Sequence, residues 1–404
     1  MSLDWTSDFD IFDERYVEDP AGVWSELREH CPIARTERRG PTFMPVRYDD
    51  IAAIAHDVTH FSSRDIGVIT PGREHGPITT TLLEAPPITS DPPLHTWARR
   101  LLLPAFSPGA IDKMTPITRQ IADELIDRFA AGSTADAAVD YAQHIPARVI
   151  AHMLGIPPED EDTFTGWAVQ ILQEGFLDFT KAADATREVI GYFRARLAER
   201  RDVPPDARPD DLMTLLIEAE IDGEPLTERH LIGSCFLLLI AGIDTTWSSI
   251  GASLWHLAAK PGDQARLRAE PELLPTAVEE FLRFYSPVTM ARVVTEDTEV
   301  GGCPMRTGDK VLMTFPAANR DPEIFERPDE FVIDRARNRH LAFGSGIHRC
   351  LGSNLARMEL QVALEAWLSR VPPFELADPD AVTWNGGQVR GPRRVPVRWG
   401  AWPG

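Results

Sequence analysis

The chain has 404 residues, 43% of them hydrophobic and 8% aromatic, which is enough to bury a large core in one or two domains. Its net charge of −21 excludes a general polyanion-binding surface, so nucleic acid is not expected as a partner. The scattered cysteines, Cys31, Cys235, Cys303 and Cys350, exclude a disulfide framework and a cysteine zinc site, and they indicate a reducing compartment.

The acidic, interrupted N-terminus lacks the basic start and apolar run of a signal peptide. The longest apolar run, residues 231–243, is too short to span a bilayer. We therefore expect a cytoplasmic protein that does not insert into a membrane.

Helical periodicity dominates the chain, with apolar residues every three or four positions in residues 117–130, 277–285 and 354–371. Short β-like runs lie among glycines and prolines, in residues 42–48, 291–297 and 310–315. The segment most like a linker, residues 200–211, is short enough to be a loop. The pattern predicts a mainly α fold with small β-sheets.

The stretch "DPPLHTWARR" predicts a helix that Asp91 caps, with Pro92 at its first position. His95 and Arg99 are four residues apart and so lie on one face of it. Taken alone, this pair could be no more than a solvated basic face.

The longest predicted helix covers residues 228–259, with Thr227 as its cap and Pro261 beyond its end. In its middle, "AGIDTT" places Gly242, Asp244 and Thr245, which are poor helix formers, inside an apolar run. This conflict indicates either a functional opening or a simple kink made by turn-prone residues.

Glu280 and Arg283 are three residues apart on one predicted helix face. As an isolated surface pair they would contribute only about 0.3 kcal/mol. A buried network would need further partners that satisfy every charge.

Cys350 precedes a helical apolar pattern and follows the glycines at 344 and 346. At a helix N-terminus the free amides and the helix dipole favour thiolate over thiol, which suits a metal ligand or a nucleophile. We expect Gly344, Gly346 and Gly352 to permit positive φ and to let a flat group approach the backbone. The alternative is a small buried hydrophobe in a turn.

The sequence "FGSGIHRCLG" resembles the cysteine-ligand loop of the haem-thiolate monooxygenases, the cytochromes P450, whose pattern is Phe-x-x-Gly-x-(His or Arg)-x-Cys-x-Gly. "AGIDTT" resembles the family's distal-helix signature, and "FERPDEFVIDR" resembles its meander, which supplies an arginine to the Glu-x-x-Arg pair. The resemblance runs from about Asp91 to the C-terminus. It implies the cytochrome P450 fold, with haem between a long distal helix and the helix after the cysteine, and residues 1–404 as a single domain.

The resemblance also implies a role for each matching residue. Cys350 is expected to be the iron ligand of haem b, and His95, Arg99, Arg292 and His348 to bind its propionates. Further expected cofactor contacts are Phe343, Gly352, Ala241 and Gly242, with Gly242 leaving room for oxygen. Asp244 and Thr245 are expected to relay protons, and Glu280, Arg283 and Arg335 to form a structural network.

The implied activity is insertion of one oxygen atom of O₂ into a lipophilic small molecule. Electrons would come from NAD(P)H through a separate ferredoxin and ferredoxin reductase, since no cofactor domain is visible in the sequence. We expect a monomer. The alternatives are a peroxide-driven haem peroxygenase, a noncatalytic haem-thiolate sensor, and nucleotide binding by "GSGIHR", which lacks the third glycine of the dinucleotide motif.

Overall fold

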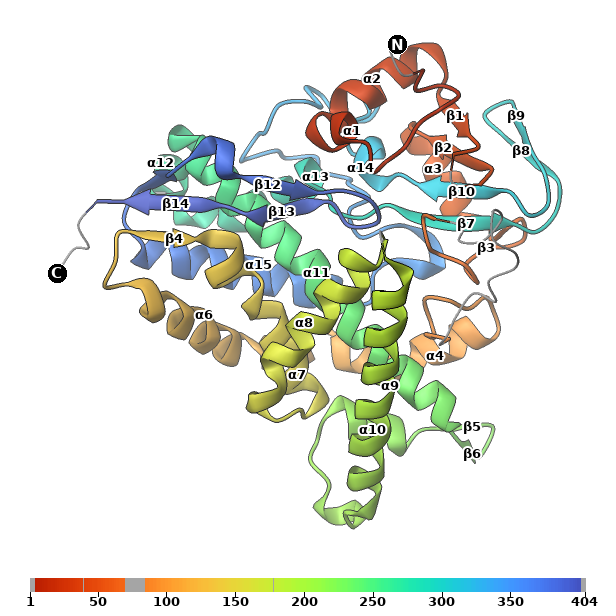
Figure 1. The fold of residues 1–404 in the computed structure, drawn as a ribbon, viewed down its shortest axis with the longest axis vertical. Helices are drawn as coiled ribbons and strands as arrows, with labels where there is room; N and C mark the ends of the chain where they lie inside the picture. The colour runs from red at the N-terminus through yellow and green to blue at the C-terminus, as the bar shows by residue number, and fades with distance from the viewer. Residues whose placement is uncertain (1–3, 39, 70–83, 177, 401–404) are drawn as a thin grey trace.

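The computed structural model describes residues 4–38, 40–69, 84–176 and 178–400, and it shows a helical body beside a group of small sheets (Figure 1). This architecture confirms the predicted mainly α fold with minor β-structure. The helices are α1 Glu14–Glu18, α2 Pro20–His30, α3 Tyr48–His56, α4 Leu94–Leu102, α5 Pro108–Asp112, α6 Thr115–Phe129, α7 His144–Leu154, α8 Glu161–Leu172, α9 Phe179–Asp202, α10 Leu212–Ile217, α11 Glu228–Ala259, α12 Pro261–Ala269, α13 Leu274–Phe284, α14 Phe315–Ala318 and α15 Ser353–Arg370.

The three predicted β segments meet in one five-stranded sheet of order β1-β2-β10-β7-β3. β10 runs parallel to β2 and antiparallel to β7, a register that places Arg292 opposite Val311. Its strands are β1 Ile33–Thr36, β2 Thr42–Pro45, β3 Phe61–Ser62, β7 Met290–Val294 and β10 Lys310–Met313. The smaller sheets comprise β4 Thr134–Asp136 with β11 Phe374–Leu376 and β14 Pro396–Trp399; β12 Thr383–Asn385 with β13 Gly391–Arg394; β5 Glu220–Ile221 with β6 Glu224–Pro225; and β8 Thr298–Val300 with β9 Cys303–Met305.

Helix α11 runs through the middle of the helical body (Figure 1). The Thr227 hydroxyl accepts the His230 N–H and so caps the helix, and Lys260 ends it before a proline, which confirms both predicted bounds. Among the described residues it is the one helix long and apolar enough to cross a membrane. However, 67% of its most apolar window is buried, which is typical of a core helix.

Helix α15 begins at Ser353, directly after the cysteine loop, as the apolar pattern predicts. It packs against α6, α11 and α13, and these helices share the largest hydrophobic core. Two smaller cores lie on opposite faces of the five-stranded sheet, one beside α2 and one beside α3. The cysteine loop thus lies between the helical body and the part of the molecule that contains the five-stranded sheet.

Helix α4 begins at Leu94, later than predicted, and Asp91 does not cap it. The Asp91 carboxylate instead accepts hydrogen bonds from the Ser62 hydroxyl (2.6 Å) and the Ser63 N–H (2.9 Å). The prediction of a capped start at Pro92 is wrong because strand β3, which lies far from Asp91 in sequence, takes the capping group.

Candidate active site

The cysteine loop is a closed turn that packs on α3. The Cys350 N–H donates to the Phe343 carbonyl at 2.7 Å, and Gly344 and Gly346 both have φ of +68°. A Cβ at Gly346 would lie 2.2 Å from the Ala55 carbonyl oxygen, so both the backbone conformation and the packing require glycine there. Gly352 differs from the expectation, because its φ is −81° and it occupies the N-cap position of α15.

The Cys350 thiol is exposed, yet enough protein surrounds it that desolvation raises its pKa. A backbone hydrogen bond from Gly352 and the charges of Arg99, Arg349 and Arg357 act in the opposite direction but do not outweigh the burial. The helix terminus thus acts in the expected direction, but its effect on the pKa is smaller than that of burial. A metal ion at the sulfur would supply the missing positive charge.

Four basic side chains gather beside this loop. The rings of His95 and His348 are 4.2 Å apart, and the charges of Arg292 and Arg99 act on both histidines. His348 bonds the Ser63 hydroxyl at 2.9 Å. The structure thus brings together all the side chains predicted to bind propionates.

The basic cluster is short of negative charge. Burial, followed by the neighbouring cationic groups, lowers the pKa of His348 to about 3, and burial lowers the pKa of Arg292 to about 10. Neither ring nitrogen of His95 makes a well-formed hydrogen bond within the described residues, although the Ile347 backbone interacts with the ring. Buried hydrogen-bond donors that lack acceptors and counter-charges favour an anionic ligand with several acceptor oxygens.

The "AGIDTT" segment lies in α11 without breaking it. Ala241 is exposed and Thr245 half-buried, on the same side of an otherwise buried helix, and the Thr245 hydroxyl donates to the Ala241 carbonyl at 2.9 Å. This bond lets a polar residue stay helical, and α11 continues through the segment. A Cβ at Gly242 would lie 3.3 Å from Ile150, so this glycine lets α7 pack closely against α11.

Asp244 is completely buried, and both of its oxygens are bound. Arg393, on β13, forms an ion pair with it at 2.7 Å, and Gln173, just after α8, donates to it at 3.3 Å. Desolvation raises the pKa of this carboxyl, against the lowering effects of the arginine and the amide. The group can therefore exchange a proton more readily than an exposed aspartate can at neutral pH.

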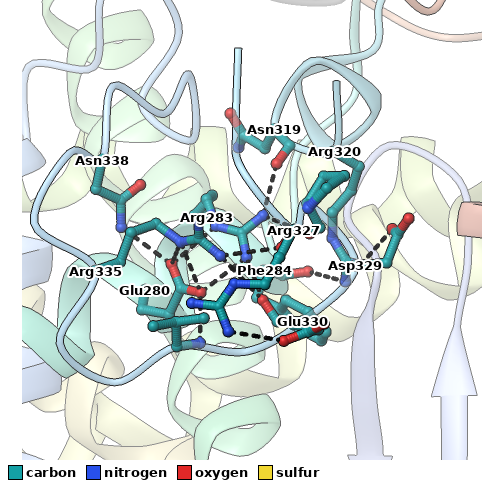
Figure 2. A network of polar contacts seen from close by, with 12 residues as sticks. Glu280, Arg283, Phe284, Asn319, Arg320, Arg327, Asp329, Glu330, Arg335 and Asn338 are labelled. Carbon is teal, nitrogen blue, oxygen red and sulfur yellow. Dashed lines mark hydrogen bonds and ion pairs between the residues drawn. The ribbon is translucent and has the colours of Figure 1, made fainter. Parts of the chain in front are cut away.

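Figure 2 shows the network around the Glu-x-x-Arg pair. Glu280 and Arg283 are fully buried, 2.8 Å apart, and Arg335 reaches the same carboxylate at 3.0 Å. The Val332 N–H and the Asn338 amide complete the shell of donors around Glu280. The structure thus joins the three residues of the predicted network, with the meander wrapped around them.

Several residues of the site could not be found from sequence patterns. Arg393 is 149 positions from Asp244, and no motif marks it. Ser63 and Gln173 likewise contact predicted residues only through the fold. Glu359 is buried between α15 and α11, where it bonds Thr246, and burial raises its pKa to about 8. The one sequence signal for it is a carboxylate inside an apolar helical pattern.

A closed cysteine loop, a basic cluster and an acid–alcohol pair on one long helix define a haem-thiolate protein. The Cytochrome P450 family model matches residues 175–381. The chain is 34% identical to the mycinamicin IV hydroxylase/epoxidase of Micromonospora griseorubida, covering 94% of this chain and 95% of that protein. It is 37% identical to the nocardicin C N-oxygenase of Nocardia uniformis, covering 88% and 89% of the two chains.

The fold agrees with these relationships. The structure of a bacillaene polyketide synthase cytochrome P450 from Bacillus subtilis 168 matches with a TM-score of 0.86 and 32% identity over 96% of this chain and 99% of that one. The chain belongs to the cytochrome P450 family and is a haem-dependent monooxygenase.

The residues present fit the haem that this family implies. Haem carries two carboxylates and an iron that accepts a thiolate. The basic cluster offers buried donors without sufficient acceptors, and the Cys350 thiol is exposed beside it. The haem carboxylates and the haem iron therefore each have candidate binding groups in this chain.

Proposed function

We propose that this chain, as one cytoplasmic and monomeric domain of residues 1–404, hydroxylates a lipophilic small molecule with electrons from a separate ferredoxin and ferredoxin reductase that draw on NAD(P)H. The observation that carries the proposal is the intact pair Asp244 and Thr245 on a helix that exposes Ala241 beside them. In the peroxygenase alternative we would expect this acid–alcohol pair to be replaced, and a sensor would not need it.

Haem would supply oxygen activation, and the chain's side chains would control where the cofactor lies and where protons go. Cys350 Sγ would hold the iron from the side of α15, with Phe343 and Gly352 shaping its loop. His95, Arg99, Arg292 and His348 would hold the two propionates through charge-assisted hydrogen bonds.

Proton delivery would fall to α11. Thr245 Oγ1 can exchange its bond to the Ala241 carbonyl for one to a molecule bound beside the helix. Asp244 would first have to leave Arg393 and Gln173, since both of its oxygens are held away from the site. Burial raises the pKa of Asp244 where it is held, which favours uptake of a proton there before the carboxyl is released.

Apolar walls support a lipophilic substrate. Val288 and Met290 are half-buried, and Val288 pairs with Val389, just after the β12–β13 turn. We expect the pocket walls to come from residues 61–94, 170–179 and 288–290 and from Leu238 and Ala241. Leu238 is buried and belongs to the main hydrophobic core. Residues 70–83 and 177, within the first two ranges, lie outside the described residues. A spectral screen of a compound library, which follows displacement of water from the iron, would identify the substrate class.

We predict that Thr245→Ala and Asp244→Asn fail differently. Thr245→Ala should still consume NAD(P)H and O₂ but release much of the reducing power as hydrogen peroxide, since proton delivery is uncontrolled. Asp244→Asn should slow oxygen-dependent turnover itself by about 100-fold, with a larger solvent deuterium effect, because a general acid is lost. Product and peroxide formed per NAD(P)H consumed distinguish the two variants.

The control for this pair is Ser253→Ala, which removes another hydroxyl that bonds the preceding turn of α11, at 2.8 Å from the Ser249 carbonyl. It should keep wild-type coupling. If Thr245→Ala formed as much product per NAD(P)H as the wild type, and Asp244→Asn kept the wild-type rate, the result would favour the sensor and peroxygenase alternatives. Peroxide-driven turnover without reductase would favour the peroxygenase.

We predict that the ferredoxin docks by the cysteine loop. Arg337, Arg339 and Arg349 are exposed there, whereas Arg357 is held by Glu279 at 2.6 Å and is structural. Reversing Arg337 and Arg339 to glutamate should slow reduction about tenfold or more at low ionic strength, and the difference should shrink as salt screens the charges. Stopped-flow reduction by a competent ferredoxin measures it.

Arg201→Glu serves as the control for surface charge, since Arg201 is also exposed but lies at the far end of α9. The ferredoxin should reduce this variant at the wild-type rate. Reduction that is insensitive both to salt and to the Arg337 and Arg339 reversal would disprove docking at this surface.

A further inference from the structure

A second cavity, of about 690 Å³, lies between the N-terminal helices, the end of α13, and strand β12. Its size is within the range of small-molecule sites. No residue predicted to bind haem lines it, although Gln173, one of its lining residues, donates to Asp244 of the candidate active site. The aromatic residues of its wall are Phe12, Trp24, Trp255, Phe284, Tyr285 and Trp384.

These aromatic side chains form a rigid wall rather than a loose surface. The rings of Trp255 and Trp384 meet edge to face at 5.2 Å, and Trp255 meets Tyr285 in the same way at 5.8 Å. The Tyr285 hydroxyl is held by His256 at 2.6 Å. Such a wall favours a flat aromatic group in the cavity.

Two guanidinium groups line the same cavity with incomplete compensation. Arg320 is 7% exposed; it pairs with Asp329 at 3.0 Å and donates to the Phe284 carbonyl at 2.9 Å, and its Nε has no partner among the described residues. Arg390 donates to the Val17 carbonyl at 2.7 and 3.1 Å and, within the described part of the chain, forms no ion pair with a carboxylate. Burial lowers the pKa of both arginines to about 10.

A buried hydroxyl adds a third donor. Ser286 lines the cavity, is 5% exposed, and its Oγ has no hydrogen-bond partner in the described structure. An unpaired buried hydroxyl is destabilising unless something bonds it. Two arginines and one hydroxyl therefore face the cavity with unused donor capacity.

We propose that this cavity is a second small-molecule site, separate from the haem site, that binds an aromatic monocarboxylate. The carboxylate would accept from Arg390, Arg320 and Ser286, and the ring would pack on the aromatic wall. The ligand carries a single charge, because Glu14, Glu18 and Asp19 also line the cavity and the charge of Asp19 already acts on Arg390, so each further negative charge is repelled more strongly.

The test uses the haem-loaded full chain and 3-phenylpropionate as the probe, followed by isothermal titration calorimetry. We expect saturable binding with an unchanged haem absorption spectrum, because the probe does not enter the haem site. The matched amide, 3-phenylpropanamide, and the amine, 2-phenylethylamine, should bind at least about tenfold more weakly, since they cannot replace a charge-assisted bond to arginine.

Variants locate the site. Arg390→Gln should weaken the probe about tenfold or more, Arg390→Lys should recover part of that loss, and Ser286→Ala should weaken it several-fold. Ser286→Ala keeps the test valid if Arg390→Gln fails to fold. The control is Arg394→Gln, an arginine on β13 that is 61% exposed. Absence of saturable binding, a haem spectral shift on binding, equal affinity for the amide or the amine, or wild-type affinity in both Arg390→Gln and Ser286→Ala would overturn the proposal.

Discussion

Glu280→Gln is expected to lower the free energy of unfolding by about 3–5 kcal/mol, which is a large part of the stability of a typical domain. Glu280 is fully buried and accepts from both Arg283 and Arg335. Glutamine keeps the volume but removes the charge, so two buried guanidinium groups lose their common counter-ion. Urea unfolding of the haem-loaded protein, followed by circular dichroism, measures the loss.

The control lies in the same loop. Glu330 pairs with Arg327 at 3.1 Å, but both side chains are more than half exposed. Solvent screens such a pair, so Glu330→Gln should cost less than about 1 kcal/mol. If the two variants were equally stable, the buried carboxylate would not anchor the meander, and the network in Figure 2 would be a consequence of the fold and not a support for it.

Short-range patterns predicted much of this molecule because their physics is local. The cap at Thr227 and the glycine turn before Cys350 depend on atoms only a few residues apart, and both have the expected geometry. The periodic helices α6, α13 and α15 follow from one buried face each. The three β segments were recognised singly, but nothing in them showed that they share one sheet.

Local patterns do not suffice where distant segments act on the same group. Asp91 has the right residue type and position for a cap, but Ser62 and Ser63 take its carboxylate. The Cys350 pKa depends on more than the helix terminus, because burial by the surrounding chain outweighs the lowering effect of the backbone hydrogen bond. Both effects need a tertiary contact that no local pattern contains.

The partners of Asp244 have a mechanistic consequence. Arg393 and Gln173 come from β13 and from just after α8, two elements that both pack against α11. A carboxyl held by both is stored away from Thr245, so its availability depends on how these elements are positioned. The motif on α11 specifies the groups that we propose carry protons, while the tertiary structure holds Asp244 in its ion pair with Arg393.

Cys350→Ser is expected to abolish thiolate ligation completely. In the wild-type protein, reduction under carbon monoxide should give the strongly red-shifted Soret band of a thiolate-bound haem. Cys350 is the residue to which the exposed position, the closed loop and the basic cluster all point. A serine hydroxyl is far harder to deprotonate, so it cannot supply the same anionic donor to iron.

The matched control is Cys303→Ser, because Cys303 is also partly accessible but lies on β9, outside the cysteine loop. It should retain the shifted band and full haem content. Haem content by extraction separates loss of the ligand from loss of the cofactor, since the basic cluster alone could still hold haem in Cys350→Ser. A normal band in the wild-type protein, or a shifted band that survives in Cys350→Ser, would show that another group binds the iron.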